Sequence, residues 1–267
     1  MIVAYDGTDF HGWQKQSHPE HRCLRTVQDV LEKAVVKVMR HPIVLIGASR
    51  TDAGVHAKGQ VVTFDTTNHI PPDKLILGFN SWLPSDVQVR QVDIADDAFN
   101  PIYHCTSKGY KYSLAHGCSN PLRMPLFDRR FFAFTAYELN IDKMKEAAEQ
   151  FMGEHDFAGF TKLNHGRKST VRRIDQCDVY ATDDWRITMD IAGAGFLWNM
   201  VRIIAGTLLE VGRGYISPDA IPEIIASCDR RRAGKTMAAQ GLSLEWVAFD
   251  NQLPNKLAIS KNPFSEK

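Results

Sequence analysis

Two kinds of hydrophobic spacing alternate along this chain, and the alternation occurs in both of its halves. Apolar residues at helical spacing mark segments such as 27–39, whereas short alternating or wholly apolar runs such as 87–92 lie between them. The first pattern predicts amphipathic helices and the second predicts strands. Strands and helices mixed in this way favour an α+β fold, with two similar subdomains of largely antiparallel sheets and flanking helices.

The predicted elements divide into two subdomains. We expect an N-terminal α+β subdomain over residues 1–100, a C-terminal α+β subdomain over 101–250 and a polar tail over 251–267. Thr26 and Asn140 have side chains suited to cap the helices that follow them. The first subdomain has predicted strands at 2–5, 43–46, 60–64 and 87–92, and helices at 27–39 and 72–82. The second has predicted strands at 108–114, 130–134, 173–181, 185–192 and 244–249, and helices at 140–152, 196–211 and 218–228.

The composition argues against several classes of protein. The chain has 267 residues, 44% of them hydrophobic, which is enough for a full core. No apolar run approaches the roughly 18 residues of a membrane-spanning helix and no leader opens the chain, so we expect a cytoplasmic protein. The five cysteines are odd in number and widely spaced, which argues against disulfides or a zinc site. Gly193-Ala194-Gly195 lacks the third glycine of a dinucleotide-binding loop, so neither a metal nor a dinucleotide site is predicted.

Basic residues gather in three runs, although the net charge is only +1. A nearly neutral chain argues against nucleic-acid binding over the whole surface, but it permits a basic groove that acidic residues elsewhere balance. Two interpretations stay open for these runs, a solvated surface or a phosphate-binding surface. The runs are Arg123, Arg129 and Arg130; Lys162, Arg167, Lys168, Arg172 and Arg173; and Arg230, Arg231, Arg232 and Lys235.

A short polar segment, Arg50-Thr51-Asp52-Ala53-Gly54-Val55-His56-Ala57, lies between two predicted strands. It places the Asp52 carboxylate between the cation Arg50 and the turn-forming Gly54. Catalytic groups are often carried on polar loops that a rigid sheet presents. Because Asp and Gly also favour turns for local backbone reasons, the residues alone leave Asp52 either a turn residue or a catalytic carboxylate.

Two further residues are candidates for the same site. Arg202 lies in the strongly apolar segment 196–211, and a buried lone charge is costly, so its guanidinium must meet a carboxylate, a phosphate or water. Either it reaches the surface, or it pairs with Asp52 and keeps that carboxylate ionised. Tyr110 and Tyr112 alternate with lysines, which puts both rings on one face of a strand. Tyr112 is expected to pack in the core, whereas Tyr110 is a candidate platform for a stacked base.

Taken in order along the chain, these segments resemble the tRNA pseudouridine synthase A family. The Arg-Thr-Asp-Ala-Gly-Val-His motif is highly specific, and the matching segments cover nearly the whole chain. They are Tyr5-Asp6-Gly7-Thr8, Gly12-Trp13-Gln14, Thr26-Val27-Gln28, the segment 50–57, Gly59-Gln60-Val61, Asn80-Ser81-Trp82-Leu83-Pro84, Tyr110-Lys111-Tyr112, His155-Asp156-Phe157, the segment 195–202, and Gly241-Leu242-Ser243-Leu244.

The resemblance implies the pseudouridine synthase fold and a homodimer that uses neither cofactor nor metal. It implies that the protein isomerises uridine to pseudouridine at nucleotides 38–40 of tRNA, in the anticodon stem-loop. By the same resemblance, Asp52 is the catalytic carboxylate and Arg202 pairs with it. Arg50 helps to displace the target nucleotide, and Tyr110 stacks on its base.

The chain departs from the family's pattern at three places. Ser49 stands where glycine is usual, residues 102–106 replace a basic stretch, and Ala238-Ala239-Gln240 replaces a more proline-rich one. These departures leave Asp52 in place and bear on which tRNA positions are modified. A synthase for another RNA and a non-catalytic RNA-binding module of the same fold are the two alternatives.

Overall fold

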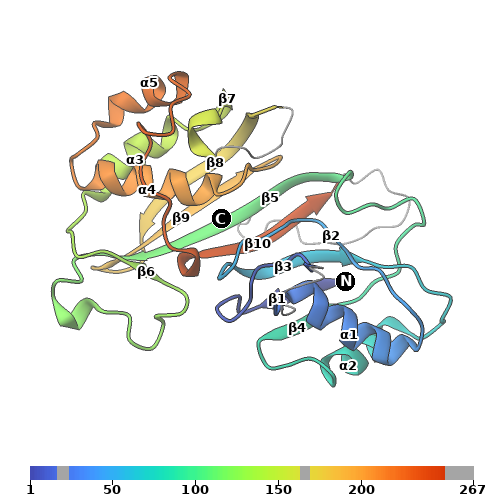
Figure 1. Cartoon of the computed structure of the whole chain (residues 1–267). Coiled ribbons are helices and arrows are strands. Elements are labelled where there is room, and N and C mark those ends of the chain that lie inside the picture. The colour runs from blue at the N-terminus through green and yellow to red at the C-terminus, as the bar shows by residue number, and fades with distance from the viewer. Residues whose placement is uncertain (17–23, 163–168, 250–267) are drawn as a thin grey trace. The chain divides into compact units, whose positions relative to one another are not determined.

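The chain forms two compact units, shown in Figure 1 by a computed structural model that describes residues 1–16, 24–162 and 169–249. Unit 1 contains residues 1–106 and the chain from Leu244 onward, and unit 2 contains residues 107–243. Both units mix helices with strands that pair almost entirely antiparallel, so the predicted α+β class is confirmed. The predicted polar tail 251–267 lies outside the described residues.

The sheet of unit 1 has the strand order β4-β1-β3-β10, with β2 beside β3. Its register places Ile2 opposite Val61 and Tyr5 opposite Val87. Helix α2 contacts both α1 and β4. The strands are β1 (Ile2–Tyr5), β2 (Ile46–Gly47), β3 (His56–Thr63), β4 (Val87–Gln91) and β10 (Leu242–Phe249), and the helices are α1 (Val27–Met39) and α2 (Pro72–Asn80).

Helix α1 follows its sequence pattern closely. The Thr26 hydroxyl accepts a hydrogen bond from the Asp29 N–H at 3.4 Å, which satisfies one of the amides left open at a helix start. Leu31 and Val35 are fully buried on the inner face. The helix ends at Met39 because Arg40 adopts the left-handed conformation, with φ 58°. The predicted bounds and N-cap are therefore confirmed.

The sheet of unit 2 has the strand order β5-β9-β8-β7, with β6 parallel to β5. Helix α3 lies against β8 and α4. The rings of Phe151 and Phe157 both meet Phe160 edge to face, at centroid distances of 5.4 and 5.8 Å. The strands are β5 (Cys105–Ala115), β6 (Ala133–Phe134), β7 (Gly153–Asp156), β8 (Val171–Ala181) and β9 (Arg186–Gly193), and the helices are α3 (Ile141–Glu149), α4 (Met200–Gly212) and α5 (Ile221–Ala226).

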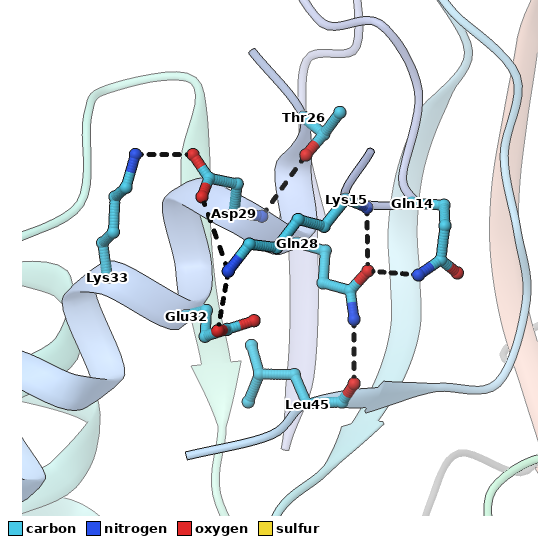
Figure 2. Close-up of polar contacts among 8 residues, drawn as sticks. All are labelled: Gln14, Lys15, Thr26, Gln28, Asp29, Glu32, Lys33 and Leu45. Carbon is cyan, nitrogen blue, oxygen red and sulfur yellow. Dashed lines mark hydrogen bonds and ion pairs between the residues drawn. The ribbon is translucent and has the colours of Figure 1, made fainter. Parts of the chain in front are cut away.

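The strand predicted at 43–46 is wrong for most of its length. Only residues 46–47 join the sheet, as β2, and the Val44 side chain is 77% exposed. The Leu45 carbonyl accepts a hydrogen bond from the Gln28 side chain at 2.9 Å (Figure 2). A side chain thus takes the carbonyl that a longer strand would have offered to a neighbour.

Other differences concern where elements begin and end. Strand β3 begins at His56, so the last two residues of the polar segment belong to a strand. The apolar helix begins at Met200 rather than residue 196, because Asn199 has a left-handed φ of 63°. The strand predicted at 130–134 is reduced to β6, and the helices predicted to 82, 152 and 228 end earlier, at 80, 149 and 226. Within the described residues, no helix combines the length and apolarity needed to cross a membrane.

Candidate active site

Asp52 opens a tight turn. Its carbonyl accepts a hydrogen bond from the Val55 N–H at 3.1 Å, and Gly54, the third residue of the turn, has φ 79°. Glycine adopts this left-handed conformation without the steric cost that a Cβ brings, as in type II turns. Asp52 is half-buried, whereas Arg50 and Ala53 are exposed. Asp52 is thus a turn residue in a position where its carboxylate is also partly accessible.

The chain segment 10–13 holds this turn on both sides of Asp52. The Gly54 N–H donates to the Phe10 carbonyl at 3.2 Å, and the Thr51 carbonyl accepts from the Trp13 N–H at 3.0 Å. The hydroxyls of Thr51 and Tyr5 are 2.7 Å apart, within hydrogen-bond distance. The backbone around the carboxylate is therefore fixed by bonds to two other parts of unit 1.

Gln60 on β3 holds the other end of the segment. Its side chain is fully buried, and it donates to the Ser49 carbonyl at 2.6 Å and accepts from the Ser49 N–H at 3.2 Å. One amide therefore binds both backbone groups of the residue that precedes Arg50. Ser49 itself is buried, so the residue that departs from the family's pattern lies within this bonded framework.

A second glutamine, Gln28, supports the chain next to the segment 10–13, through side-chain bonds that Figure 2 shows. The Gln28 side-chain oxygen accepts from the Gln14 side chain at 2.7 Å and from the Lys15 N–H at 2.9 Å. The Gln28 N–H donates to the Trp13 carbonyl at 3.0 Å. Sequence reasoning assigned no role to Gln28 or Gln60. The available signal was that both glutamines stand in segments that resemble the family, at 26–28 and 59–61.

In unit 2, the Arg202 side chain is directed by two partners. Its Nε donates to the Met237 carbonyl at 2.7 Å, and its Nη1 donates to the Asn199 side-chain oxygen at 2.9 Å. The Met237 N–H donates in turn to the Arg202 carbonyl at 3.2 Å. Arg202 lies in the first turn of α4, and Asn199 directly precedes the helix, so the turn that starts α4 also orients the guanidinium.

The two tyrosines of β5 differ in their surroundings. Tyr112 is fully buried and donates its hydroxyl to the Ala238 carbonyl at 2.8 Å, so its predicted core packing is confirmed. Burial raises the pKa of Tyr112, and the nearby charge of Arg202 opposes that rise. Tyr110 is 8% exposed, and its ring meets the Phe196 ring edge to face at a centroid distance of 5.3 Å. Phe196 therefore packs against the Tyr110 ring.

The predicted site residues fall in both units. Arg50 and Asp52 share the turn segment of unit 1, and Tyr110 and Arg202 belong to unit 2. The pairing of Arg202 with Asp52 stays a prediction. Within unit 2, Arg202 binds Met237, and the next residue, Ala238, accepts the hydroxyl of Tyr112, the neighbour of Tyr110 on the same face of β5.

Several arginines of the three basic runs have carboxylate partners. Arg123 contacts Glu138 at 2.5 Å, and Arg173 contacts Asp175 at 2.7 Å. Arg231 contacts Asp229 at 2.8 Å, and Arg232 contacts Glu223 at 2.9 Å. These pairs favour the interpretation of the arginines concerned as solvated surface. Arg167 and Lys168 lie outside the described residues.

No metal-binding arrangement is found among the residues that the structure describes. No group of three or more histidine, cysteine, aspartate or glutamate side chains there is placed to hold an ion. The described cysteines, Cys105, Cys118, Cys177 and Cys228, are free thiols. Cys23 lies outside the described residues.

Comparison with known proteins connects this geometry to a family. The family described as tRNA pseudouridine synthase matches residues 1–104 and 147–250. The chain is 41% identical to tRNA pseudouridine synthase A of Ruminiclostridium cellulolyticum and 42% identical to that of Thermoanaerobacter sp.. It is 39% identical to that of Geobacter sulfurreducens, and each match covers 93% of this chain and 98% of the relative. The resemblance predicted from the motifs is confirmed, and the chain belongs to the tRNA pseudouridine synthase family, whose members are isomerases that act on tRNA uridine.

Proposed function

We propose that the protein converts uridine to pseudouridine at nucleotides 38–40 in the anticodon stem-loop of tRNA, with Asp52 as the catalytic carboxylate and without a cofactor. Membership of the family supports the reaction and the tRNA substrate. The observation that carries the site is the half-buried Asp52 on a turn whose backbone is hydrogen-bonded on both sides. A fixed backbone aims a reacting group before the substrate arrives, which is an efficient way to lower a barrier.

The reaction rearranges bonds within one nucleotide. The bond from N1 of uracil to C1′ of the ribose breaks, the uracil turns, and a bond from C5 to C1′ forms. The proton on C5 is released and N1 takes up a proton, so no oxidant or reductant is required. The Asp52 carboxylate can assist by attacking C1′, which gives a covalent adduct, or by removing a sugar proton in an elimination route.

The target base must leave its stack before any carboxylate can reach its sugar, and this costs a few kcal/mol. Arg50 is exposed and lies two residues before Asp52, so we assign it to displacing the nucleotide. Tyr110, whose ring packs against Phe196, is assigned to stacking on the base. Arg202 is assigned to pairing with Asp52, which favours the ionised carboxylate.

The assignment of Asp52 is tested by mapping pseudouridine in unmodified tRNA after incubation with the protein. Wild type should form it within the anticodon stem-loop, and Asp52→Asn should form none. Asp65→Asn, an equal change at an exposed carboxylate of unit 1, should match wild type. Equal product from Asp52→Asn would remove Asp52 from the chemistry, and no product from wild type would refute the proposed function.

The same mapping separates the alternatives. Pseudouridine that appears in total RNA but not in the tRNA anticodon arm would indicate a synthase for another RNA. Tight tRNA binding by wild type without any product would indicate a non-catalytic binding module.

Arg202 is tested by separating turnover from affinity. Arg202→Ala should lower turnover far more than it weakens tRNA binding, because the guanidinium is assigned to the carboxylate rather than to a phosphate. Equal losses of turnover and affinity would assign Arg202 to the phosphate path instead. Single-turnover rates and a binding titration on the same preparations give both quantities.

The proposal includes a cytoplasmic homodimer. The dimer is supported by exposed apolar side chains along residues 122–137, where Leu122 is 88% exposed and Phe127 is 94% exposed. Apolar groups gathered in this way are typical of an interaction surface. Light scattering should give the mass of a dimer for wild type and a lower mass for Phe127→Ser. A monomeric wild type would refute this part of the proposal.

A further inference from the structure

The segment 233–238 lies directly against helix α4 in unit 2. Its Gly234 N–H donates to the Thr207 hydroxyl at 2.9 Å, and that hydroxyl donates to the Ile203 carbonyl at 2.9 Å. A Cβ on Gly206 would lie 1.9 Å from the Lys235 carbonyl oxygen, so backbone touches backbone at this point. The segment is therefore seated on α4 within one helical turn of Arg202.

The far end of this segment holds the Arg202 side chain. The Met237 carbonyl accepts from Arg202 Nε, and the Met237 N–H donates to the Arg202 carbonyl. The next residue, Ala238, accepts the Tyr112 hydroxyl. The direction of the Arg202 guanidinium thus depends on where residues 237 and 238 lie.

Arg230 binds the near end of the same segment. Its Nη1 donates to the Gly234 carbonyl at 2.9 Å and to the Ala233 carbonyl at 3.4 Å, and its Nη2 contacts the Thr236 hydroxyl at 3.2 Å. The planar fork of a guanidinium can hold several acceptors at once, which an ammonium group cannot do with the same geometry. One side chain therefore binds three residues of the segment.

The neighbouring arginines are used differently. Arg231 pairs with Asp229, and Arg232 pairs with Glu223 on α5, so neither ion pair involves the segment. This run, whose sequence leaves open a solvated or a phosphate-binding surface, thus contains arginines with distinct tasks. Arg230 is the one that points its guanidinium into the protein's own backbone.

We propose that Arg230 is a positioning residue for the reaction: it holds the segment 233–238 on α4 and so orients the Arg202 guanidinium. The inference rests on the proposed function, in which Arg202 supports Asp52. Arg230 itself meets neither substrate nor carboxylate in this role. Its loss lets the Met237 carbonyl move away from Arg202 Nε, which lowers the rate of the chemical step.

The test compares Arg230→Ala with Arg232→Ala, which removes the same charge from the same run but releases α5 instead. For Arg230→Ala, the single-turnover rate should fall about 10- to 100-fold, the scale expected when a reacting group is misplaced by about 1 Å. The dissociation constant for tRNA should stay within about twofold, as should both quantities for Arg232→Ala. Arg230→Lys, which keeps the charge without the fork, should recover only part of the rate.

Non-additivity sharpens the test. Because Arg230 acts through Arg202, the variant Arg202→Ala with Arg230→Ala should react as slowly as Arg202→Ala alone. Two losses that multiply would overturn the proposal. So would an Arg230→Ala variant that binds tRNA more weakly with a flatter salt dependence, since this marks a lost phosphate contact.

A readout on the free protein separates this inference from the proposed function. Amide hydrogen exchange at Gly234 and Met237 should accelerate in Arg230→Ala and not in Arg232→Ala. Unchanged exchange at both amides would overturn the positioning role even if turnover fell. If wild type forms no pseudouridine, the proposed function fails, while accelerated exchange would still support the hold of Arg230 on the segment.

Discussion

Gln60→Met is the substitution that tests most directly how the Asp52 turn is held. It removes the amide that binds both backbone groups of Ser49, and it keeps the length and approximate volume of the side chain. Gln60 is fully buried, so no solvent-exposed charge or helix propensity changes with it. The effect therefore reports on two hydrogen bonds next to Arg50.

The magnitude follows from those two bonds. Each has good length, 2.6 and 3.2 Å, and a buried hydrogen bond of this kind contributes about 1 kcal/mol net. We expect Gln60→Met to lower the free energy of unfolding by about 2 kcal/mol. For a chain of this size that corresponds to a fall in Tm of about 4–8 °C.

Thermal unfolding followed by circular dichroism measures this change, with Gln88→Met as the matched control. Gln88 lies on β4 with its side chain exposed, so its replacement should change stability by no more than about 0.5 kcal/mol. A Gln60→Met protein that melts within about 2 °C of Gln88→Met would refute the assigned role of the amide. In single-turnover assays on the same proteins, Gln60→Met should form product more slowly, whereas Gln88→Met should not.

Three further predictions concern the rest of the chain. Gly206→Ala should destabilise the protein by about 1–3 kcal/mol in denaturant unfolding, because its Cβ would meet the Lys235 carbonyl. Gly195→Ala, with open space around its Cβ, should cost well under half of that. Equal costs would contradict the close approach of the two backbones at Gly206. Hydrogen bonds from Arg231 lower the pKa of Asp229 to about 2. The pair therefore stabilises the fold above the ordinary carboxyl pKa, and this contribution is lost as the pH falls toward about 2. An NMR titration should give that pKa, and Arg231→Ala should raise it toward the ordinary value. Burial raises the pKa of Cys177 to about 12, so iodoacetamide at pH 8 should leave this thiol unmodified in the folded protein while it labels the exposed Cys228. Peptide mass spectrometry measures both modifications, and early modification of Cys177 would contradict the prediction.

Local patterns predicted the helices of this protein well where the cap and the apolar stripe agreed. Helix α1 shows both signals, in Thr26 and in the buried positions that follow, and its bounds are those of the prediction. The start of α4 was predicted four residues early, because residues 196–199 continue the apolar pattern while Asn199 turns the backbone out of the helix. A positive φ at a residue other than glycine leaves little trace in sequence.

Tertiary hydrogen bonds explain most of what sequence could not supply. Residues 43–45 have the apolar character of a strand, but Gln28 from a helix takes one of their carbonyls. Local preferences made a turn at Asp52 and Gly54 one of two interpretations, whereas the bonds from residues 10–13 and Gln60 that hold this segment come from distant parts of the chain. The sequence does not distinguish Arg230 from its neighbours, because a run of arginines does not reveal which guanidinium binds the protein's own backbone.

The return of β10 to unit 1 has a consequence for how the protein is made. The strand lies beside β3, and Lys58 on β3 contacts Glu245 on β10 at 3.1 Å. A ribosome delivers residues 1–106 first, but the neighbour that β3 requires on this side is translated only after all of unit 2. Residues 1–106 include β2, which also pairs with β3, so the nascent N-terminal sheet lacks β10 as a neighbour until the last strand has been translated.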